Sequence, residues 1–433
     1  MAQLTDDCFA FSGPLLPLAE MERLIAERIK PVIETEAIAL RGARGRVTAA
    51  DVKAPVDLPP FDNSAVDGYA VRHADLKADG DTSLTVAGRL MAGSRAEQAL
   101  KAGEAIRIFT GAAMPAGADT VFMQEDVTVQ KTETGDRVTV PKGLKIGSNR
   151  RLAGEDVLAG NIVLPAGTVL EAQHIALAAA LGLTEITVRR RLKVAIFSTG
   201  DEVVEPGSPR GAAAIFDANR YLLSALLERL GVVVTDLGIL ADAAAELARA
   251  LAKAAAWHDL VITSGGVSTG EADHVRNAVE RIGSLVFWRV AIKPGRPVAM
   301  GVIRAAPRKD YAANSGAAFV GLPGNPVAVF VTFVRVVKPL LLRLAGAQPQ
   351  VLVPLPVRAA FAYKKKKDRR EYVRVALRRG ADGEIEAVKH PQDGAGILTS
   401  LTETDGLLEF AEQVTSIEAG ERVGFLSYAS LLG

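Results

Sequence analysis

The sequence predicts a multidomain α/β protein built around a central doubly wound α/β domain. From Leu192 to Gly346, apolar strand-like runs alternate with helical segments, as in a parallel sheet covered on both faces. Residues 70–160 instead show short alternating runs separated by Gly and Pro, which is typical of a β-rich domain. Residues 350–433 return to short strands with glycine turns and predict a small β-barrel or sandwich.

A chain of 433 residues is long enough for about three domains, each with a core of its own. We expect two separate segments to form an extended linker domain and the residues between them to form an inserted β-rich domain. The expected boundaries are 1–54 with 161–188 for the linker, 55–160 for the insertion, 189–345 for the α/β domain and 346–433 for the C-terminal domain.

The elements follow from periodicity and breakers. Residues 14–40 predict an amphipathic helix that Pro31 interrupts and a short strand after it, and residues 172–183 predict a second helix. In the α/β domain we expect strands at 192–198, 232–235, 260–262, 285–292, 298–300 and 319–322, and helices at 221–230, 243–256, 274–282 and 327–344.

Bulk properties exclude several classes of protein. A formal net charge of +1 argues against a general nucleic-acid binder, and the single Cys8 excludes an internal disulfide and a cysteine-based zinc site. The most apolar helix contains Arg335 and is followed by Lys338-Pro339, so it is too short to span a bilayer. Asp6-Asp7 stand where a signal peptide would be basic. We expect a soluble cytoplasmic protein without nucleic-acid or membrane partners.

The most informative stretch is 258–273, where an apolar run leads into Gly265-Gly266, Ser268 and the acid Asp273. Strand, glycine turn and helix form the layout in which backbone N–H groups and a helix dipole receive an anion, and nearby carboxylates can hold Mg²⁺ on it. A plain tight turn with Asp273 as N-cap explains the same residues. The stretch alone leaves both interpretations open.

Two nucleotide-binding signatures are absent. The spacing of Gly265 and Gly270 fits a P-loop, but Glu271-Ala272 replace the required Lys-Ser/Thr, and no G-x-G-x-x-G opens a helix. In a parallel sheet the ligand site lies at the carboxyl ends of the strands. The loops expected there are 199–202, 240–242, 264–273, 293–297 and 323–326, and all carry polar or charged residues.

Six motifs in this order make a family resemblance specific. They are Asp62-Asn-Ser-Ala-Val-Asp-Gly-Tyr-Ala-Val71, Ile106-Arg-Ile-Phe-Thr-Gly111, Ser198-Thr-Gly-Asp-Glu202, Ser264-Gly-Gly-Val-Ser-Thr-Gly-Glu-Ala-Asp273, Ala291-Ile-Lys-Pro-Gly295 and Leu322-Pro-Gly-Asn-Pro326. Over nearly the whole chain the sequence resembles the molybdopterin molybdenumtransferases, the MoeA and gephyrin E-domain family of molybdenum cofactor synthesis.

The resemblance implies a reaction and an assembly. Adenylylated molybdopterin and molybdate give molybdenum cofactor and AMP with the help of Mg²⁺, in the final step of cofactor synthesis. The α/β domain would be MogA/MoaB-like, and the linker would support an elongated homodimer. Each site would be composite, completed by N-terminal loops of the second subunit. A MogA-like adenylyltransferase and molybdoenzymes are implied as further contacts.

The same resemblance assigns catalytic and metal-binding roles to acids on separate loops. Glu202, Asp242 and Asp273 match positions that the family uses around nucleotide, pterin and metal, and we expect them to bind Mg²⁺ or the pterin. A solvated turn is the alternative for Glu202, and an N-cap of a helix starting at Ala243 is the alternative for Asp242. Lys293, fixed between an apolar strand and a proline-rich loop, would attract phosphate or molybdate; a plain exposed charge is its alternative.

Two further groups of residues complete the expected site. Gly265, Gly266 and Ser268 would bind pterin or nucleotide, together with Asp67, Thr110 and Asp156 reaching across the dimer. Each of the last three also fits an ordinary turn.

Molybdate would lie against Pro323, Pro326, Arg374 and Arg369. Asn325 as N-cap and Pro326 at the first helical position explain that turn structurally as well. In the later loop Gly394-Ala395-Gly396 replaces the family's Gly-Ser-Gly, a departure that removes a hydroxyl beside the expected arginine.

Two competing functions remain at this stage. Relatives with the same α/β domain act as adenylyltransferases or nucleotide pyrophosphatases, and the gephyrin E domain also serves as a non-catalytic scaffold. The N-terminal half and the C-terminal barrel favour molybdenum insertion. A scaffold of the gephyrin type would be supported by an extra partner domain and a linker to it, and the sequence shows neither.

Overall fold

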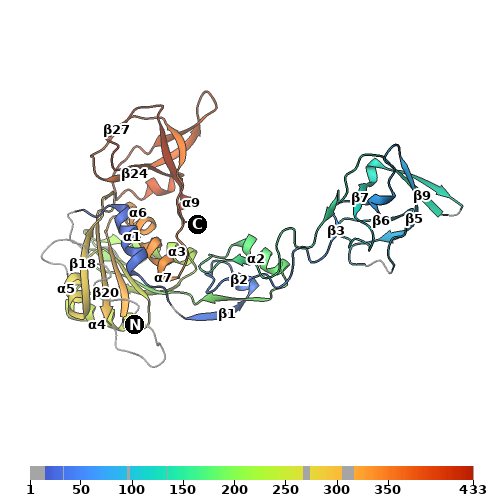
Figure 1. Ribbon diagram of the computed structural model, residues 1–433. Coiled ribbons are helices and arrows are strands. Elements are labelled where there is room, and N and C mark those ends of the chain that lie inside the picture. Colours follow the sequence, from blue (N-terminus) through green and yellow to red (C-terminus); the bar gives the residue numbers. More distant parts are fainter. Residues whose placement is uncertain are drawn as a thin grey trace.

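A six-stranded sheet forms the centre of the α/β domain (Figure 1). The structure is a computed structural model and describes residues 15–32, 34–94, 98–133, 135–266, 274–304 and 316–432. The strand order of the sheet is β16-β13-β17-β21-β20-β18. The strands are β13 (Lys193–Ser198), β16 (Val233–Ile239), β17 (Leu260–Ser264), β18 (Gly283–Arg289), β20 (Pro297–Arg304) and β21 (Gly316–Leu322), with a small side ladder of β14 (Val203–Val204) and β15 (Ile215–Phe216).

Helices cover both faces of this sheet, which confirms the doubly wound architecture. They are α3 (Asn219–Arg229), α4 (Ala244–Ala255), α5 (His274–Ile282), α6 (Pro326–Thr332), the π-helical turn η4 (Phe333–Val337) and α7 (Lys338–Leu344). Along β17, Leu260 and Ile262 face a core shared with α3, α6 and α7, whereas Val261 faces α4 and α5. Successive strand residues point to opposite faces, so a strand buried on both sides needs an unbroken apolar run.

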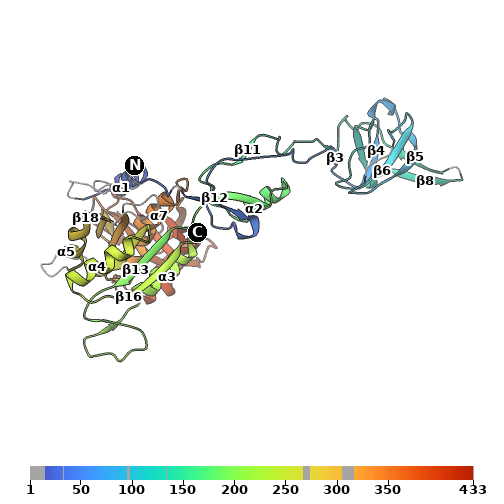
Figure 2. The ribbon, with the colours of Figure 1, turned by 90° about the horizontal axis from the view of Figure 1, so that it is seen from below.

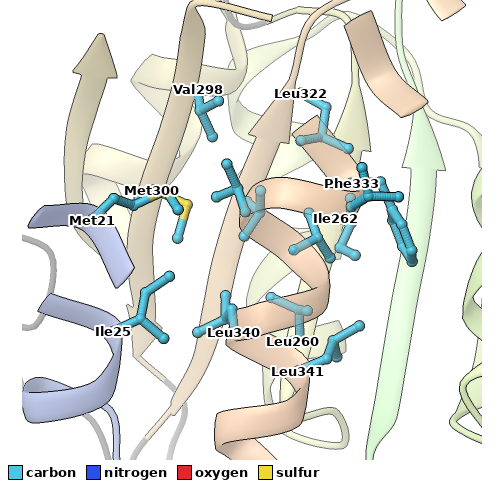
Figure 3. Close-up of a cluster of buried hydrophobic side chains, with 14 of the residues drawn as sticks. Met21, Ile25, Leu260, Ile262, Val298, Met300, Leu322, Phe333, Leu340 and Leu341 are labelled. Carbon is cyan, nitrogen blue, oxygen red and sulfur yellow. The ribbon is translucent and has the colours of Figure 1, made fainter. Parts of the chain in front are cut away.

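Helix α1 (Leu18–Arg28) belongs to the larger core, although it precedes the linker in the chain. Met21 and Ile25 of α1 lie with Met300 of β20 and with Leu340 of α7 in one cluster of buried side chains (Figure 3). The helix ends at Arg28, two residues before Lys30-Pro31, as the proline predicts.

One strand departs from the expected all-parallel sheet. β20 runs antiparallel to both of its neighbours, β18 and β21, while β13, β16, β17 and β21 are mutually parallel. The reason is connectivity: only residues 290–296 separate β18 from β20, and a parallel partner would need a crossover of a dozen or more residues.

The C-terminal region is a closed five-stranded barrel. Of the two architectures that the sequence predicts for it, barrel or sandwich, the barrel is therefore correct. Its strands pair in the ring β24-β25-β22-β28-β26 and back to β24. The elements are β22 (Leu355–Ala359), β23 (Tyr363–Lys364), β24 (Arg370–Arg379), β25 (Ile385–Lys389), α8 (Thr399–Thr402), β26 (Gly406–Phe410), β27 (Ser416–Ile417), β28 (Arg422–Ser427) and α9 (Tyr428–Leu432). Strand β19 (Ile292–Lys293) of the preceding region adds to β24 in parallel and joins barrel to α/β domain.

Two chain segments that lie far apart in sequence build the linker. β1 pairs with β12 and β2 with β11, both antiparallel. The linker elements are β1 (Thr35–Ala39), η1 (Leu40–Gly42), β2 (Val52–Lys53), β11 (Ile162–Leu164), α2 (Ala172–Ala180) and β12 (Glu185–Arg189).

The inserted residues form a separate β-rich domain at the far end of the linker, well away from the α/β domain in both views (Figures 1 and 2). Its sheet has the order β7-β4-β6-β5-β9-β8. The elements are β3 (Asn63–Ser64), β4 (Gly68–Val71), η2 (His73–Asp75), β5 (Thr82–Leu90), β6 (Glu104–Ile108), β7 (Thr120–Met123), η3 (Gln124–Asp126), β8 (Thr128–Thr132), β9 (Gly135–Val140) and β10 (Arg150–Arg151). We call linker and β-rich domain together the arm. No helix within the described ranges is long and apolar enough to cross a membrane.

Candidate active site

The carboxyl ends of the parallel strands meet at one edge of the central sheet. Ser198 of β13 pairs with Ile239 of β16 and with Ser264 of β17, and Ser264 pairs in turn with Leu322 of β21. The loops that follow these four residues therefore begin side by side, as the sequence predicts for a ligand site.

The glycine pair makes a left-handed turn directly after β17. Gly265 and Gly266 have φ of 86° and 65°, a region that L side chains rarely adopt. The Gly265 N–H donates to the carbonyl of Leu322, and a Cβ on Gly266 would lie 2.6 Å from Thr199 Cγ2. The turn thus needs glycine for its backbone and for the close approach of Thr199. Ser268 and Asp273, which belong to the same predicted site, lie outside the described residues.

Two of the predicted acids follow neighbouring strands at this edge. Glu202 is exposed in the turn after β13, where its carboxylate lies over Gly200, and Asp242 is half-buried after β16. Helix α4 begins at Ala244 with Ala243 as N-cap, so the alternative of Asp242 as the N-cap is wrong. Among the described residues, neither carboxylate has a hydrogen-bond or ion-pair partner.

These two carboxylates fit a magnesium site by their chemistry. Mg²⁺ is usually held by one or two protein carboxylates together with substrate phosphates, and carboxylate oxygens are the ligands it prefers. In the described part of the chain no group of three or more His, Cys, Asp or Glu side chains forms a complete metal cage. The two described carboxylates are ligands of the kind that Mg²⁺ uses when phosphate oxygens supply the others.

Three buried hydroxyls near the same edge were not anticipated from the sequence. The Oγ atoms of Ser198, Thr199 and Thr263 are buried and have no hydrogen-bond partner among the described residues. A buried polar atom without a partner costs free energy unless something else satisfies it. Ser198 and Thr199 belong to the motif 198–202, in which sequence reasoning picked only Glu202 as a site residue. Only the packing at the glycine turn shows that these two hydroxyls are also candidates.

The turn before α6 matches its predicted geometry. Asn325 is the N-cap and Pro326 the first helical residue, while Pro323 directly follows β21. The N–H of Val327 donates to the carbonyl of Ala395, so one of the helix's N-terminal donors is used by the barrel loop and is not free for an anion. Pro323 and Pro326 therefore lie where α/β domain and barrel meet.

Lys293 and Arg369 converge on one carboxylate that sequence reasoning missed. Lys293 Nζ lies 3.2 Å from Oε2 of Glu371, and Arg369 lies 2.6 Å from Oε1. Tyr363 donates its hydroxyl to the same Oε2 at 2.9 Å. The Glu371 side chain is 1% exposed and that of Lys293 is 48% exposed. The available signal was that only two acids, Asp368 and Glu371, interrupt the basic run 364–374.

The pKa of Glu371 reflects this environment. Burial alone would raise the pKa of the carboxyl, but the hydrogen bonds from its three donors outweigh burial and hold the pKa below its ordinary value. Glu371 is therefore an anion that anchors two cations from two domains. The cluster of Lys293, Arg369 and Glu371 carries a net charge of +1, and the half-exposed ammonium faces solvent.

Arg374, the second predicted barrel arginine, is 5% exposed. Its Nε donates to Ser400 Oγ at 3.0 Å, and its Nη2 donates to the carbonyls of Gln392 and Gly394 at 3.0 and 3.1 Å. Burial lowers the pKa of the guanidinium, and no described carboxylate forms an ion pair with it. Arg374 therefore holds the loop that contains Ala395, and Ser400 supplies a hydroxyl on its Nε.

Asp67 and Thr110 lie together in the β-rich domain. Oδ1 of Asp67 accepts the backbone N–H of Thr110 at 2.8 Å and its hydroxyl at 2.7 Å. These two hydrogen bonds, the backbone one first, hold the pKa of Asp67 below its ordinary value. Asp156 is exposed at the base of this domain, where its N–H donates to the carbonyl of Leu58.

Within one chain the predicted residues fall into separate groups. Glu202, Asp242 and the glycine pair share the edge of the central sheet, and Lys293 and Arg369 lie at the joint with the barrel. Asp67 and Thr110 adjoin strands β4 and β6 of the β-rich domain, which lies at the far end of the arm (Figure 2). A site that uses all of them cannot form inside a single extended subunit.

Comparison with known proteins decides the family. Three family models match in succession: the MoeA N-terminal region (domains I and II) over residues 16–182, a probable molybdopterin binding domain over 195–343, and the MoeA C-terminal region (domain IV) over 356–428. A molybdopterin molybdenumtransferase of Haemophilus influenzae is 37% identical over 420 residues, which cover 97% of this chain and all of that protein. The chain belongs to the MoeA family of molybdopterin molybdenumtransferases.

Other members agree with this assignment. A molybdopterin molybdenumtransferase of Nostoc is 40% identical over 317 residues, 72% of this chain and 70% of that protein. The crystal structure of a molybdopterin biosynthesis MoeA protein from Pyrococcus horikoshii matches with a TM-score of 0.77 at 30% identity, covering 96% of this chain and all of that one. The whole architecture of arm, α/β domain and barrel is thus that of the MoeA family.

Ala395, where the sequence resemblance leads us to expect a serine, lies between the barrel and α6. Its carbonyl accepts the Val327 N–H, and it stands next to Gly394, whose carbonyl accepts from Arg374. Hydrogen bonds to the carbonyls of Gly394 and Ala395 therefore fix the backbone of this loop. A serine at position 395 would add a hydroxyl that alanine lacks. Ser400 is buried and already bonded to Arg374, so it does not restore an outward-facing hydroxyl.

Proposed function

We propose that this chain inserts molybdenum into adenylylated molybdopterin, using molybdate and releasing AMP. The observation that carries the proposal is the edge of the central sheet in a MoeA-family chain. A glycine turn lies there together with hydroxyls and two carboxylates that have no partner within the described ranges. Such an edge offers donors for a diphosphate and oxygen ligands for a hard cation on that diphosphate.

The chain's own residues position the substrate and neutralise charge. The Gly266 N–H and the hydroxyls of Ser198 and Thr199 would donate to phosphate oxygens, because none of these three donors has a hydrogen-bond partner among the described residues. Glu202 and Asp242 would hold Mg²⁺, which when bound neutralises charge on the diphosphate. Phosphoryl chemistry needs little else from the protein than positioning and electrostatic stabilisation.

Molybdate would enter at the joint between α/β domain and barrel. Lys293 there has a half-exposed ammonium whose position Glu371 fixes, and Arg369 is held by the same carboxylate. A fixed cation attracts an oxyanion more effectively than a mobile one, because less side-chain entropy is lost on binding. Pro323 and Pro326 would form the wall of this subsite.

We further propose that the active unit is a homodimer with composite sites. The support is the separation of Asp67 and Thr110 from Glu202 and Asp242 within one chain (Figure 1). An arm of this reach can place the β-rich domain of one subunit on the sheet edge of the other. Contacts with a MogA-like adenylyltransferase and with molybdoenzymes, like the cytoplasmic location, stay predictions.

The decisive assay supplies purified protein with adenylylated molybdopterin, molybdate and Mg²⁺ and measures AMP and molybdenum cofactor. Insertion requires both products in equal amounts. AMP without cofactor would indicate a pyrophosphatase, and ATP consumption with molybdopterin would indicate an adenylyltransferase. Asp242→Asn should abolish both products, whereas the control Glu280→Gln, on the exposed face of α5, should leave them unchanged.

Subunit mixing tests the composite site directly. Asp67→Asn and Asp242→Asn are each expected to be inactive alone. If sites are composite, co-refolded or co-expressed mixtures contain hybrid dimers with one intact site, and about a quarter of the wild-type activity should return in a random mixture. No recovery in mixtures that demonstrably contain hybrid dimers would refute a site shared between subunits.

A further inference from the structure

Two arginines lie directly opposite each other on the β-rich domain. In the parallel pairing of β5 with β6, Arg89 is the partner of Arg107, and on the other side of β6, Arg107 is the partner of Tyr69. The row Tyr69–Arg107–Arg89 thus crosses three adjacent strands, which Figure 2 shows in the arm. Arg89 is exposed and Arg107 is half-buried.

Neither guanidinium forms an ion pair in the part of the chain that the structure describes. Among the described residues, neither Arg89 nor Arg107 has a carboxylate within ion-pair distance; the only hydrogen bond of Arg107 is to Gln124 Oε1. Like charges directly opposite in a sheet are destabilising. The presence of arginine at both positions therefore needs a reason other than the stability of the sheet.

The ring of Phe109 holds both guanidinium groups. The Cζ of Arg89 lies 4.7 Å from the centroid of this ring, and that of Arg107 lies 5.1 Å from it and 5.0 Å from the Tyr69 ring. Cation–π contacts fix the direction of a guanidinium while using none of its N–H donors. Apart from the Arg107 donor that is bonded to Gln124, the forked donors of both arginines have no partner among the described residues and lie at neighbouring positions.

This surface adjoins the predicted arm residues of the active site. Phe109 directly precedes Thr110, and Asp67 directly precedes β4, in which Tyr69 lies. The Asp67 carboxylate is engaged by Thr110, so it does not pair with Arg107 although it lies within its electrostatic reach. The arm thus presents two guanidinium groups beside the residues expected to reach the second subunit.

We infer that Arg89, Arg107 and Phe109 form a phosphate-binding surface that the arm contributes to the composite site, where it takes the diphosphate of adenylylated molybdopterin. The assignment of the ligand rests on the proposed function. Guanidinium forks match the geometry of phosphate oxygens, and two of them side by side suit two linked phosphates. Arg89 and Arg107 are binding residues in this role, and the ring of Phe109 positions them.

The test uses the full-length protein and inorganic pyrophosphate as probe, by isothermal titration calorimetry at low salt. Arg89→Gln and Arg107→Gln each remove one charge and keep a polar side chain. Each should weaken pyrophosphate binding roughly tenfold, the effect of losing one charge-assisted hydrogen-bonding group. Arg137→Gln on β9 is the matched control, because Arg137 is exposed on the same sheet and also has no ion pair among the described residues.

Three results would overturn the inference: no pyrophosphate binding by the wild type, variants within twofold of it, or an equal loss in Arg137→Gln. In the insertion assay, Arg107→Gln should raise KM for adenylylated molybdopterin with an unchanged KM for molybdate. If wild type inserts molybdenum and this variant keeps its KM, the inference fails while the proposed function stands. If wild type inserts none, the proposed function fails, and the pyrophosphate titration alone decides whether the arm binds phosphate.

Discussion

The glycine pair after β17 allows a prediction in which backbone strain and packing can be separated. Gly265 and Gly266 both have left-handed φ, so an alanine at either position meets the same backbone penalty of roughly 1–2 kcal/mol. Their surroundings differ. A Cβ at Gly265 would lie 3.6 Å from the Thr199 carbonyl, an ordinary contact, but one at Gly266 would lie 2.6 Å from Thr199 Cγ2 and 2.9 Å from Val275 Cγ2.

The contact at Gly266 cannot be relieved cheaply. Thr199 and Val275 are β-branched and are 3% and 0% exposed, so neither side chain has another rotamer in open space. Overpacking of this kind costs roughly 1–3 kcal/mol. We expect Gly266→Ala to destabilise the α/β domain by about 2–5 kcal/mol, and Gly265→Ala by about 1–2 kcal/mol.

Tryptophan fluorescence isolates the relevant domain. Both tryptophans of the chain, Trp257 and Trp288, lie in the α/β domain, and Trp288 is fully buried in β18. Urea unfolding followed by this signal reports that domain even though the whole chain does not unfold in one step. Equal destabilisation by the two alanines would refute the packing argument. If neither alanine destabilised the domain, the left-handed geometry itself would be wrong.

Three further predictions concern charged groups. Glu371→Gln should destabilise the barrel joint by about 2 kcal/mol at pH 7. Folding lowers the pKa of Glu371 from its ordinary 4.5, so the stability that the carboxylate adds is complete above pH 4.5 and is lost as the pH falls below that value. The thermal midpoints of variant and wild type should therefore converge in acid. Arg220→Met leaves Asp217 buried without its partner and should cost about 3–5 kcal/mol in urea unfolding, whereas Arg23→Met, which breaks only exposed pairs, should cost under about 1 kcal/mol. Thr110→Val removes the hydroxyl but keeps the backbone N–H donor to Asp67. NMR titration should find the pKa of Asp67 higher than in the wild type, yet still below that of an ordinary aspartate. A pKa unchanged from the wild type would show that the hydroxyl contributes nothing.

The sequence predicts the central edge well because periodicity is enough for it. Parallel strands with buried runs must end at one edge, so Glu202, Asp242 and Gly265 share it without any knowledge of side-chain packing. Local breakers also predict where two helices stop: α1 ends at Arg28, shortly before Pro31, and α3 ends at Arg229, shortly before Gly231. What periodicity does not give is strand direction where connections are short, which is why β20 was expected to be parallel.

Side chains that meet across domains are beyond such reasoning. Glu371 contacts Lys293 only because β19 adds to the barrel strand β24, a pairing between residues 78 positions apart. Arg89 and Arg107 come into register through a parallel pairing whose register shifts between Val86 and Gly88. A single irregular residue sets which side chains face each other, and sequence patterns do not locate it.

The distribution of charge across the chain links these observations. The sheet edge presents the carboxylates Glu202 and Asp242, and the barrel joint presents Lys293. The arm presents two arginines that form no ion pair with any described residue. A substrate that carries two phosphates and binds a divalent cation needs both kinds of group, and neither the edge nor the arm alone supplies them. Opposite charges on surfaces that one subunit keeps apart would also favour their association in a dimer, at a rate that falls with added salt. The same pairing of arm and edge would then assemble the dimer and complete the site.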